Sequence, residues 1–190
     1  MKRAVILHGT DGSPEENWFP WLKTQLEKIG YKVQVPLLPN NHTPNRNTYN
    51  DFLLSSGWDF TDNLIVGHSS GAVSILNLLM DKRTPKIETG VLVGAWSHME
   101  ETDLDREQFK DLFPSEGFDF KAINQKADSF VFVHGDDDPY CPLDQAKWLA
   151  KQTKSPIIVI QGGEHFTVNL NPKYAEFPEL TEILKQQKLL

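Results

Sequence analysis

One ten-residue stretch, residues 63–72, constrains the fold of this chain more than any other part. The apolar run Leu64–Val66 leads into Gly-His-Ser-Ser-Gly at residues 67–71, and a segment with the apolar spacing of a helix follows. A strand followed by G-x-S-x-G and then by a helix is typical of a very tight turn that holds a serine hydroxyl clear of the backbone. Glycines are needed two residues before and after the serine because a Cβ at either place would clash with the chain. The sequence therefore predicts a strained Ser69 at the end of a buried strand, beside the free N–H groups of a helix N-terminus.

The rest of the chain surrounds this turn with further strands and helices in alternation. Six short apolar runs, including the one before Ser69, are separated by helical patterns, which predicts an α/β fold with a parallel sheet. The runs are apolar on both faces, as strands covered by helices on both sides should be, so we expect a three-layer α/β/α sandwich. The expected strands are Arg3–Leu7, Lys32–Val35, Leu64–Val66, Thr89–Val93, Ser129–Val133 and Pro156–Ile160. The expected helices are Trp18–Ile29, Thr48–Leu54 with Thr48 as its cap, residues 72–82, Pro142–Gln152 and Pro178–Lys188.

Residues 97–128 form the least regular part of the chain. They carry several acidic and aromatic side chains without a consistent period. We expect one or two short helices that cover a site like a lid, and a plain surface excursion fits the same pattern. No repeat, linker or low-complexity segment divides the chain, so residues 1–190 are expected to form a single domain.

Composition excludes several classes of function. The net charge is −7, and the lysines and arginines do not cluster, so nucleic-acid binding is not expected. Only four apolar residues follow Met1–Arg3, which is too short for a signal peptide, and no apolar run is long enough to span a membrane. The single cysteine, Cys141, excludes an intrachain disulfide and fits a reducing compartment. The expected location is the cytoplasm.

A serine hydroxyl becomes a good nucleophile only when a base removes its proton and a third group orients that base. In an open parallel sheet, such partners should lie beyond the carboxyl ends of the strands. His165 follows the last expected strand in the sequence Gly-Gly-Glu-His, where the glycines allow the loop to turn back over the sheet. We therefore predict that His165 is the general base. The other five histidines are expected to be surface or structural residues: His8, His42, His68, His98 and His134.

Three consecutive aspartates, Asp136, Asp137 and Asp138, follow the strand before that one. One of them should accept the imidazole N–H and fix the tautomer of the base. A calcium loop is excluded because no glycine and no terminal glutamate fall where such a loop needs them, and we expect neither a metal nor a cofactor. The order Ser, Asp, His along the chain fits this strand–turn–helix arrangement. The residues alone do not rank the three aspartates.

An oxyanion that forms during attack needs two backbone N–H donors. One is expected from Ser70, the residue after the nucleophile. The other is expected from Thr10 in the loop after the first strand. A plain tight turn at that place is the alternative interpretation.

Four motifs together carry a resemblance to a known family: Val5-Ile-Leu-His-Gly, Gly67-His-Ser-Ser-Gly-Ala, Gly135-x-x-Asp138-x-x-x-Pro142 and Gly163-x-His165-Phe. They resemble those of a small α/β-hydrolase, and more narrowly those of the retinoblastoma-binding protein 9/YdeN family of short serine hydrolases. The resemblance implies six parallel strands in the order 2-1-3-4-5-6, without the usual antiparallel start. It also implies that Asp138 is the catalytic acid. The Leu-x-Cys-x-Glu segment tied to retinoblastoma-protein binding is absent, because Tyr140 and Pro142 flank Cys141, so this binding is not implied.

The expected function is hydrolysis of a small ester or amide through an acyl-enzyme on Ser69. A catalytically quiet binding protein on the same fold is one alternative, with an unknown protein partner. Acyl transfer or carbon–carbon bond cleavage by the same residues is another. The aromatic residues that could line a substrate pocket are Trp96, Phe166, Tyr140, Trp18 and Trp58.

Overall fold

The computed structural model describes residues 2–190, and its central feature is a six-stranded sheet. The strands are β1 (Lys2–Leu7), β2 (Tyr31–Gln34), β3 (Leu64–His68), β4 (Ile87–Val93), β5 (Ala127–Gly135) and β6 (Ile157–Ile160). All neighbouring strands are parallel, and their order is β2-β1-β3-β4-β5-β6. Both the parallel sheet and the order expected from the resemblance are thereby confirmed.

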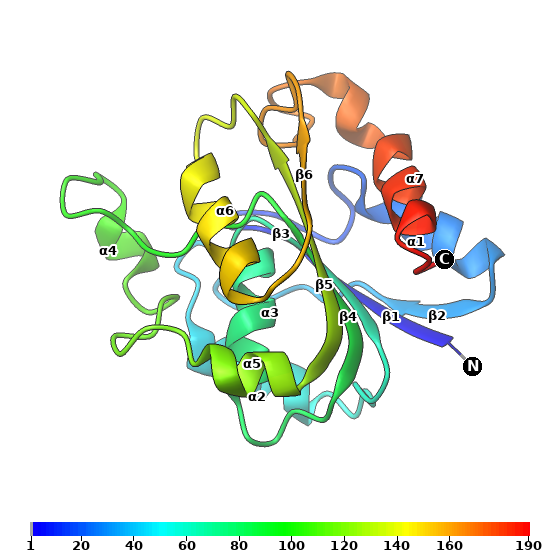
Figure 1. Cartoon of the computed structure of the whole chain (residues 1–190), viewed down its shortest axis with the longest axis horizontal. Coiled ribbons are helices and arrows are strands. Elements are labelled where there is room, and N and C mark those ends of the chain that lie inside the picture. Colours follow the sequence, from blue (N-terminus) through cyan, green and yellow to red (C-terminus); the bar gives the residue numbers. More distant parts are fainter. Residues whose placement is uncertain (1) are drawn as a thin grey trace.

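Helices cover both faces of this sheet (Figure 1). The elements α1 (Phe19–Lys28) and α7 (Pro178–Gln186) lie on one face. The other face carries α2 (Arg46–Ser55), α3 (Ser70–Met80), α5 (Phe120–Gln125) and α6 (Leu143–Gln152). Two short elements complete the chain, namely α4 (Arg106–Phe109) and the 3-10 helix η1 (Pro172–Ala175), whose Tyr174 packs in the same core as α1 and α7. The three-layer sandwich predicted from strands that are apolar on both faces is confirmed.

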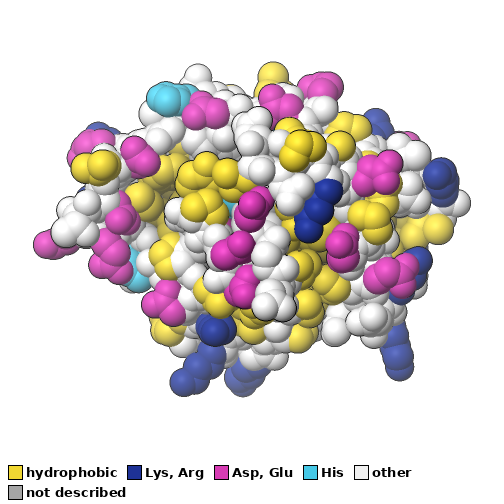
Figure 2. Space-filling model, turned by 90° about the horizontal axis from the view of Figure 1, so that it is seen from above, with side chains coloured by type: hydrophobic (Ala, Val, Ile, Leu, Met, Phe, Trp, Pro, Cys, Tyr) yellow, Lys and Arg dark blue, Asp and Glu magenta, His cyan; other side chains and the backbone are white. Residues whose placement is uncertain are grey.

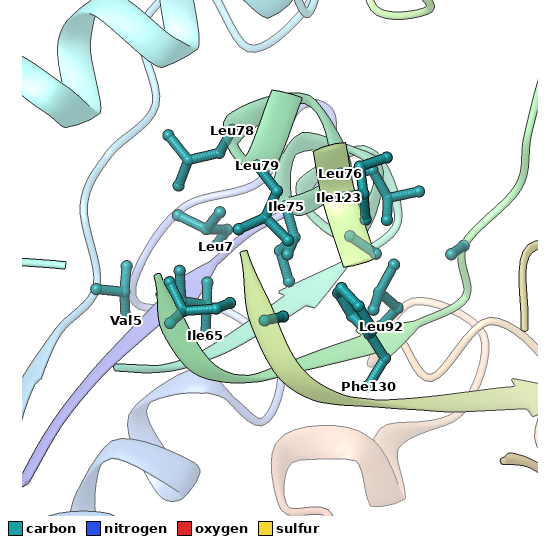
Figure 3. Close-up of a cluster of buried hydrophobic side chains, with 14 of the residues drawn as sticks. Val5, Leu7, Ile65, Ile75, Leu76, Leu78, Leu79, Leu92, Ile123 and Phe130 are labelled. Atoms are coloured by element: carbon teal, nitrogen blue, oxygen red, sulfur yellow. The ribbon is translucent and has the colours of Figure 1, made fainter. Parts of the chain in front are cut away.

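Each face of the sheet has its own apolar core because side chains alternate along a strand. In β1, Val5 and Leu7 pack with the buried side of α3, which is apolar along most of its length. Figure 3 shows this cluster, in which Ile75 and Leu79 of α3 lie over the sheet. The alternate residues Ala4 and Ile6 of β1 belong to the second cluster, with α1 and α7. The helix that begins at the Gly-His-Ser-Ser-Gly turn is therefore fixed by one of the two main cores.

The start of α2 differs from the prediction, which placed its cap at Thr48. The helix begins at Arg46, and the Asn45 side chain accepts hydrogen bonds from the N–H groups of Asn47 and Thr48, each at 3.0 Å. Asparagine is the stronger cap, since its carbonyl reaches two free N–H groups and leaves Thr48 inside the first turn. Most strand ends also lie one or two residues away from the expected positions, as element ends commonly do.

Two short helices, α4 and α5, lie in the irregular segment 97–128, as expected. No helix in residues 2–190 has both the length and the apolar character needed to cross a membrane.

The strand order of the sheet reverses its direction where the site is expected. The chain moves outward from β1 to β2 and then returns to the other side of β1 for β3. At such a reversal, the loops that follow the two strands diverge to opposite faces and leave room for a ligand. The loop after β1 and the turn after β3 both begin at this point.

Candidate active site

Ser69 occupies the strained turn that its flanking glycines predicted. Its backbone angles are φ 55° and ψ −125°, a positive φ that non-glycine residues rarely adopt. A Cβ on Gly67 would overlap the Gly71 carbonyl, and a Cβ on Gly71 would overlap the Leu7 carbonyl of β1. The Ser69 N–H donates to the Val93 carbonyl at 2.9 Å, which ties the turn to the end of β4. Ser69 is therefore held at the carboxyl edge of the sheet by both of its strand neighbours.

His165 and Asp138 form a buried pair at the same edge. Their side chains are 6% and 1% exposed, and His165 Nδ1 lies 2.7 Å from Asp138 Oδ2. The other Asp138 oxygen accepts the N–H groups of Tyr140 and Cys141, both at 2.9 Å. Burial by itself would raise the pKa of Asp138, but the bond and charge of His165 and these two N–H groups hold it below its ordinary value. Asp138 is thus an ionised acceptor, so the His165 nitrogen that faces it carries the proton.

The two preceding aspartates bind the same loop by its backbone. Asp136 Oδ1 accepts the Gly162 N–H at 2.8 Å, and Asp137 Oδ1 accepts the Glu164 N–H at 2.7 Å. All three aspartates therefore hold the loop after β6, but only Asp138 reaches the imidazole. Because all three aspartates contact this loop, the sequence alone did not indicate which of them orients the base.

His68, inside the Gly-His-Ser-Ser-Gly turn, supports His165 from below. Its Nε2 donates to the His165 carbonyl at 2.8 Å, and the centroids of the two rings are 4.8 Å apart. Burial, together with the neighbouring His165 ring, lowers the pKa of His68 to about 3. His68 is therefore a neutral structural donor, in line with the structural role expected for it.

This buried histidine predicts a pH dependence of stability. The unfolded chain protonates His68 near the ordinary pKa of 6.5, whereas the folded protein does not. The free energy of unfolding should therefore fall as the pH drops below about 6.5, with up to about 1.4 kcal/mol per pH unit from this residue. His68→Gln keeps an N–H donor but does not titrate, so urea unfolding between about pH 7 and pH 5 should show a shallower loss of stability. An unchanged slope would contradict this account.

The loop after β1 lies directly against the serine turn. Thr10 Oγ1 donates to Ser70 Oγ at 2.9 Å, and a Cβ on Gly9 would come within 2.9 Å of Ser69 Cβ. Within the described chain, the backbone N–H groups of Thr10 and Ser70 donate to no protein acceptor. The loop is braced by His8, whose Nδ1 donates to the Gly9 carbonyl at 2.8 Å. The structure therefore brings together the two N–H donors that the sequence proposed.

A family model described as serine hydrolase matches residues 4–186 of this chain. The chain belongs to the serine hydrolase family. The hydrolase YdeN of Bacillus subtilis (strain 168) is 29% identical over 167 residues, which cover 87% of this chain and 86% of that protein. The crystal structure of the B. subtilis ydeN gene product is similar over 98% of both chains, with a TM-score of 0.87 and 25% identity. These findings confirm the resemblance: the protein is a YdeN-like small serine hydrolase.

More distant structures share the fold of this hydrolase. Est1E from Butyrivibrio proteoclasticus has a TM-score of 0.70 at 19% identity, over 99% of this chain and 87% of that one. A meta-cleavage product hydrolase from Pseudomonas fluorescens IP01 has a TM-score of 0.68 at 14% identity, over 100% of this chain and 89% of that one.

Three of the five aromatic residues expected in a substrate pocket of the hydrolase lie elsewhere. Trp18 and Phe166 are fully buried in the core under α1 and α7, where the Trp18 indole N–H donates to the Phe166 carbonyl at 3.1 Å. Trp58 donates to Asn63, at the opposite end of β3 from Ser69. A side chain can contact a substrate only through its exposed surface, and Trp18 and Phe166 have no exposed surface. These residues stabilise the fold and are not pocket residues.

The other two aromatic residues do border the site. Tyr140 is 64% exposed, and its ring lies edge-on to His165 with centroids 5.1 Å apart. Trp96 packs with Cys141 in a third apolar cluster, to which Leu112 and Phe113 of the irregular segment also belong. Figure 2 shows the end of the molecule seen from above Figure 1, where apolar side chains gather with acidic ones around them.

Cys141 is a site residue that the sequence did not signal. It is buried, and Ser69 is near enough to its thiol to influence the thiol's pKa. Burial, followed by the Asp138 charge, raises the pKa of the Cys141 thiol well above its ordinary value, so the thiol keeps its proton. In residues 2–190, one set of metal-type ligand atoms lies within 4.8 Å of one another, those of Asp138, Cys141 and His165. The protonated thiol and the Asp138–His165 hydrogen bond fit proton transfer better than metal binding.

Proposed function

We propose that this hydrolase cleaves small esters or amides through an acyl-enzyme. Ser69 is the nucleophile, His165 is the base, and the Asp138 carboxylate orients His165. One observation carries the proposal: a buried, hydrogen-bonded Asp138–His165 pair lies at the same sheet edge as the strained Ser69. Because Asp138 holds the proton on Nδ1, the His165 Nε2 lone pair is free to accept the Ser69 proton.

The steps follow from these positions. Ser69 Oγ attacks the substrate carbonyl carbon while His165 Nε2 takes its proton. The Thr10 and Ser70 N–H groups stabilise the charge that develops on the carbonyl oxygen. His165 then protonates the leaving alcohol or amine, and the acyl group stays on Ser69 as an ester. In the second half His165 activates a water molecule, which releases the acid and restores Ser69.

The substrate is proposed to be small and neutral. Trp96, Leu112 and Cys141, which lies three residues along the chain from Asp138, form a buried apolar cluster, and Phe113 of segment 97–128 packs against it. We propose that this segment acts as the lid of a single-domain enzyme. A structure from Nitrososphaera gargenis that shares the fold is described as that of a carboxylesterase, which supports ester hydrolysis first. Labelling by a fluorophosphonate probe, which is expected to modify Ser69, tests the proposal.

The hydrogen bond between the Thr10 and Ser70 side chains can be removed while both backbone N–H groups stay in the chain. Its removal tests whether the alignment of these two N–H groups affects catalysis. Thr10→Val has nearly the same shape but lacks the hydroxyl that donates to Ser70 Oγ. We expect kcat for a p-nitrophenyl ester to fall about fivefold, with KM little changed, because one hydrogen bond that aligns the two loops is lost. Thr10→Ser keeps the donor and is the control. Equal losses in both variants would show that the bond does not align the donors.

A further inference from the structure

A cavity of about 500 Å³ lies between the irregular segment and α6. Its lining includes Ser97, His98, Phe118, Asp144, Gln145 and Trp148. Ser69, Asp138 and His165 are not among the described residues that line it. Trp96, which directly precedes Ser97, packs with Cys141 in the third apolar cluster.

Gln145 makes this cavity chemically specific. It is only 7% exposed, and its Oε1 accepts three donors: the Ser97 N–H at 2.9 Å, the His98 N–H at 3.1 Å and the Ser97 hydroxyl at 3.2 Å. Two backbone N–H groups cannot face an NH2 group, so the orientation of the amide is fixed. Its Nε2 has no protein partner in the described chain and is not sealed by protein. Because Gln145 lines the cavity, both hydrogens of this NH2 group are available to donate to a ligand there.

The rest of the lining defines what such a ligand must offer. Trp148 is 45% exposed, and its ring is held edge-on by Phe120 with centroids 5.4 Å apart. Phe118 packs against the same Phe120 at 5.9 Å. Trp148 and Phe118 thus give aromatic surface to a flat, apolar group.

The charges near the cavity select against anions. Asp144, one turn before Trp148 on α6, adds an exposed carboxylate that accepts hydrogen bonds. The His98 ring on the other side is paired with the Glu100 carboxylate at 2.9 Å. The whole chain is acidic as well, with a net charge of −7. A carboxylate ligand would therefore be repelled, whereas an amide N–H would find an acceptor.

We propose that this cavity binds a small, neutral, aromatic carboxamide at a site separate from Ser69. The carbonyl of the ligand accepts from Gln145 Nε2, its N–H donates to Asp144, and its ring packs against Trp148 and Phe118. This site does not depend on the proposed hydrolysis, because none of the three residues proposed for catalysis lines it.

Ligand-observed NMR titration with benzamide tests the proposal. The whole protein should bind benzamide saturably, with a Kd in roughly the millimolar range expected for so small a ligand. Benzoate, which has the same shape and a negative charge, should bind roughly tenfold more weakly or not at all. Ser69→Ala should bind benzamide as the natural protein does, because the catalytic serine is not part of the site.

Two variants examine the residues that define the cavity. Gln145→Glu keeps an oxygen for the Ser97 and His98 donors but replaces the Nε2 donor, so benzamide binding should weaken roughly tenfold. Trp148→Ala removes an exposed wall and should weaken binding without unfolding the protein, and thermal unfolding checks both variants. The proposal is overturned if benzamide does not saturate, if neither variant weakens binding, if benzoate binds as tightly, or if Ser69→Ala abolishes binding.

Discussion

Replacing Ser69 by alanine is expected to lower kcat for p-nitrophenyl esters by roughly four to six powers of ten, to the rate that binding and the oxyanion donors alone support. Only the hydroxyl group is removed. The turn itself should persist because Gly67 and Gly71, which avoid backbone overlap at this turn, are unchanged. Alanine at a φ of 55° is strained to a similar degree as serine. Steady-state kinetics on the purified variant measures the loss.

Ser55→Ala serves as the matched control for this substitution. Ser55 is exposed near the end of α2, far along the chain from the site, and its hydroxyl contacts only the Phe52 carbonyl of its own helix. We expect its kcat to equal that of the natural protein. If Ser69→Ala retained more than about one tenth of the activity, another residue would have to be the nucleophile.

Asp138→Asn is expected to have the second largest effect, a fall in kcat of roughly three to four powers of ten. Asparagine places either a donor or a weaker, uncharged acceptor at the position of Oδ2, 2.7 Å from His165 Nδ1. When the NH2 group faces the ring, Nδ1 becomes the acceptor and Nε2 carries the proton. His165 then cannot take the Ser69 proton. The measurement is again kcat, with thermal unfolding to show that the fold is kept.

Asp137→Asn provides the control for that experiment. Its remaining carbonyl oxygen can still accept the Glu164 N–H, so the loop that carries His165 stays in place. A loss of less than about tenfold is expected, since only the strength of one hydrogen bond changes. A greater loss in Asp137→Asn than in Asp138→Asn would show that the acid had been assigned to the wrong aspartate.

The sheet and its layers could be predicted because their causes are local and repeated. Strands such as Leu64–Val66 and Ser129–Val133 are short and apolar on both faces, which only a sheet covered on both sides accommodates. The turn at Ser69 could be predicted because two close contacts, at Gly67 and Gly71, exclude any side chain. Such steric requirements leave a clear trace in the sequence.

The direction in which a loop side chain points could not be predicted from the sequence. Phe166 directly follows His165, which suggested a place in the pocket, yet a positive φ of 56° turns the chain and Phe166 packs in the core. The ranking of Asp136 to Asp138 depended in the same way on how two loops meet. Gln145 reads as one more polar residue of an amphipathic helix, and only its three donors reveal its fixed amide.

The irregular segment shows a third limit of sequence reasoning. Its aromatic residues pack on one another edge to face, as Phe109 and Phe113 do with Trp96. These contacts join residues by tertiary packing and follow neither a helical nor a strand period. Two short helices were the most that the pattern could indicate, and the role of the segment as a lid stays a prediction, as does the cytoplasmic location.

The central claim is that Ser69, activated by His165 and Asp138, attacks the substrate. Treatment of the natural protein with a fluorophosphonate, followed by protease digestion and peptide mass mapping, tests it most directly. We expect one adduct per chain, on the peptide that contains Ser69, and no adduct on the Ser69→Ala variant. A natural protein that never labels, or an adduct on another residue such as Ser97 or Cys141, would contradict the claim.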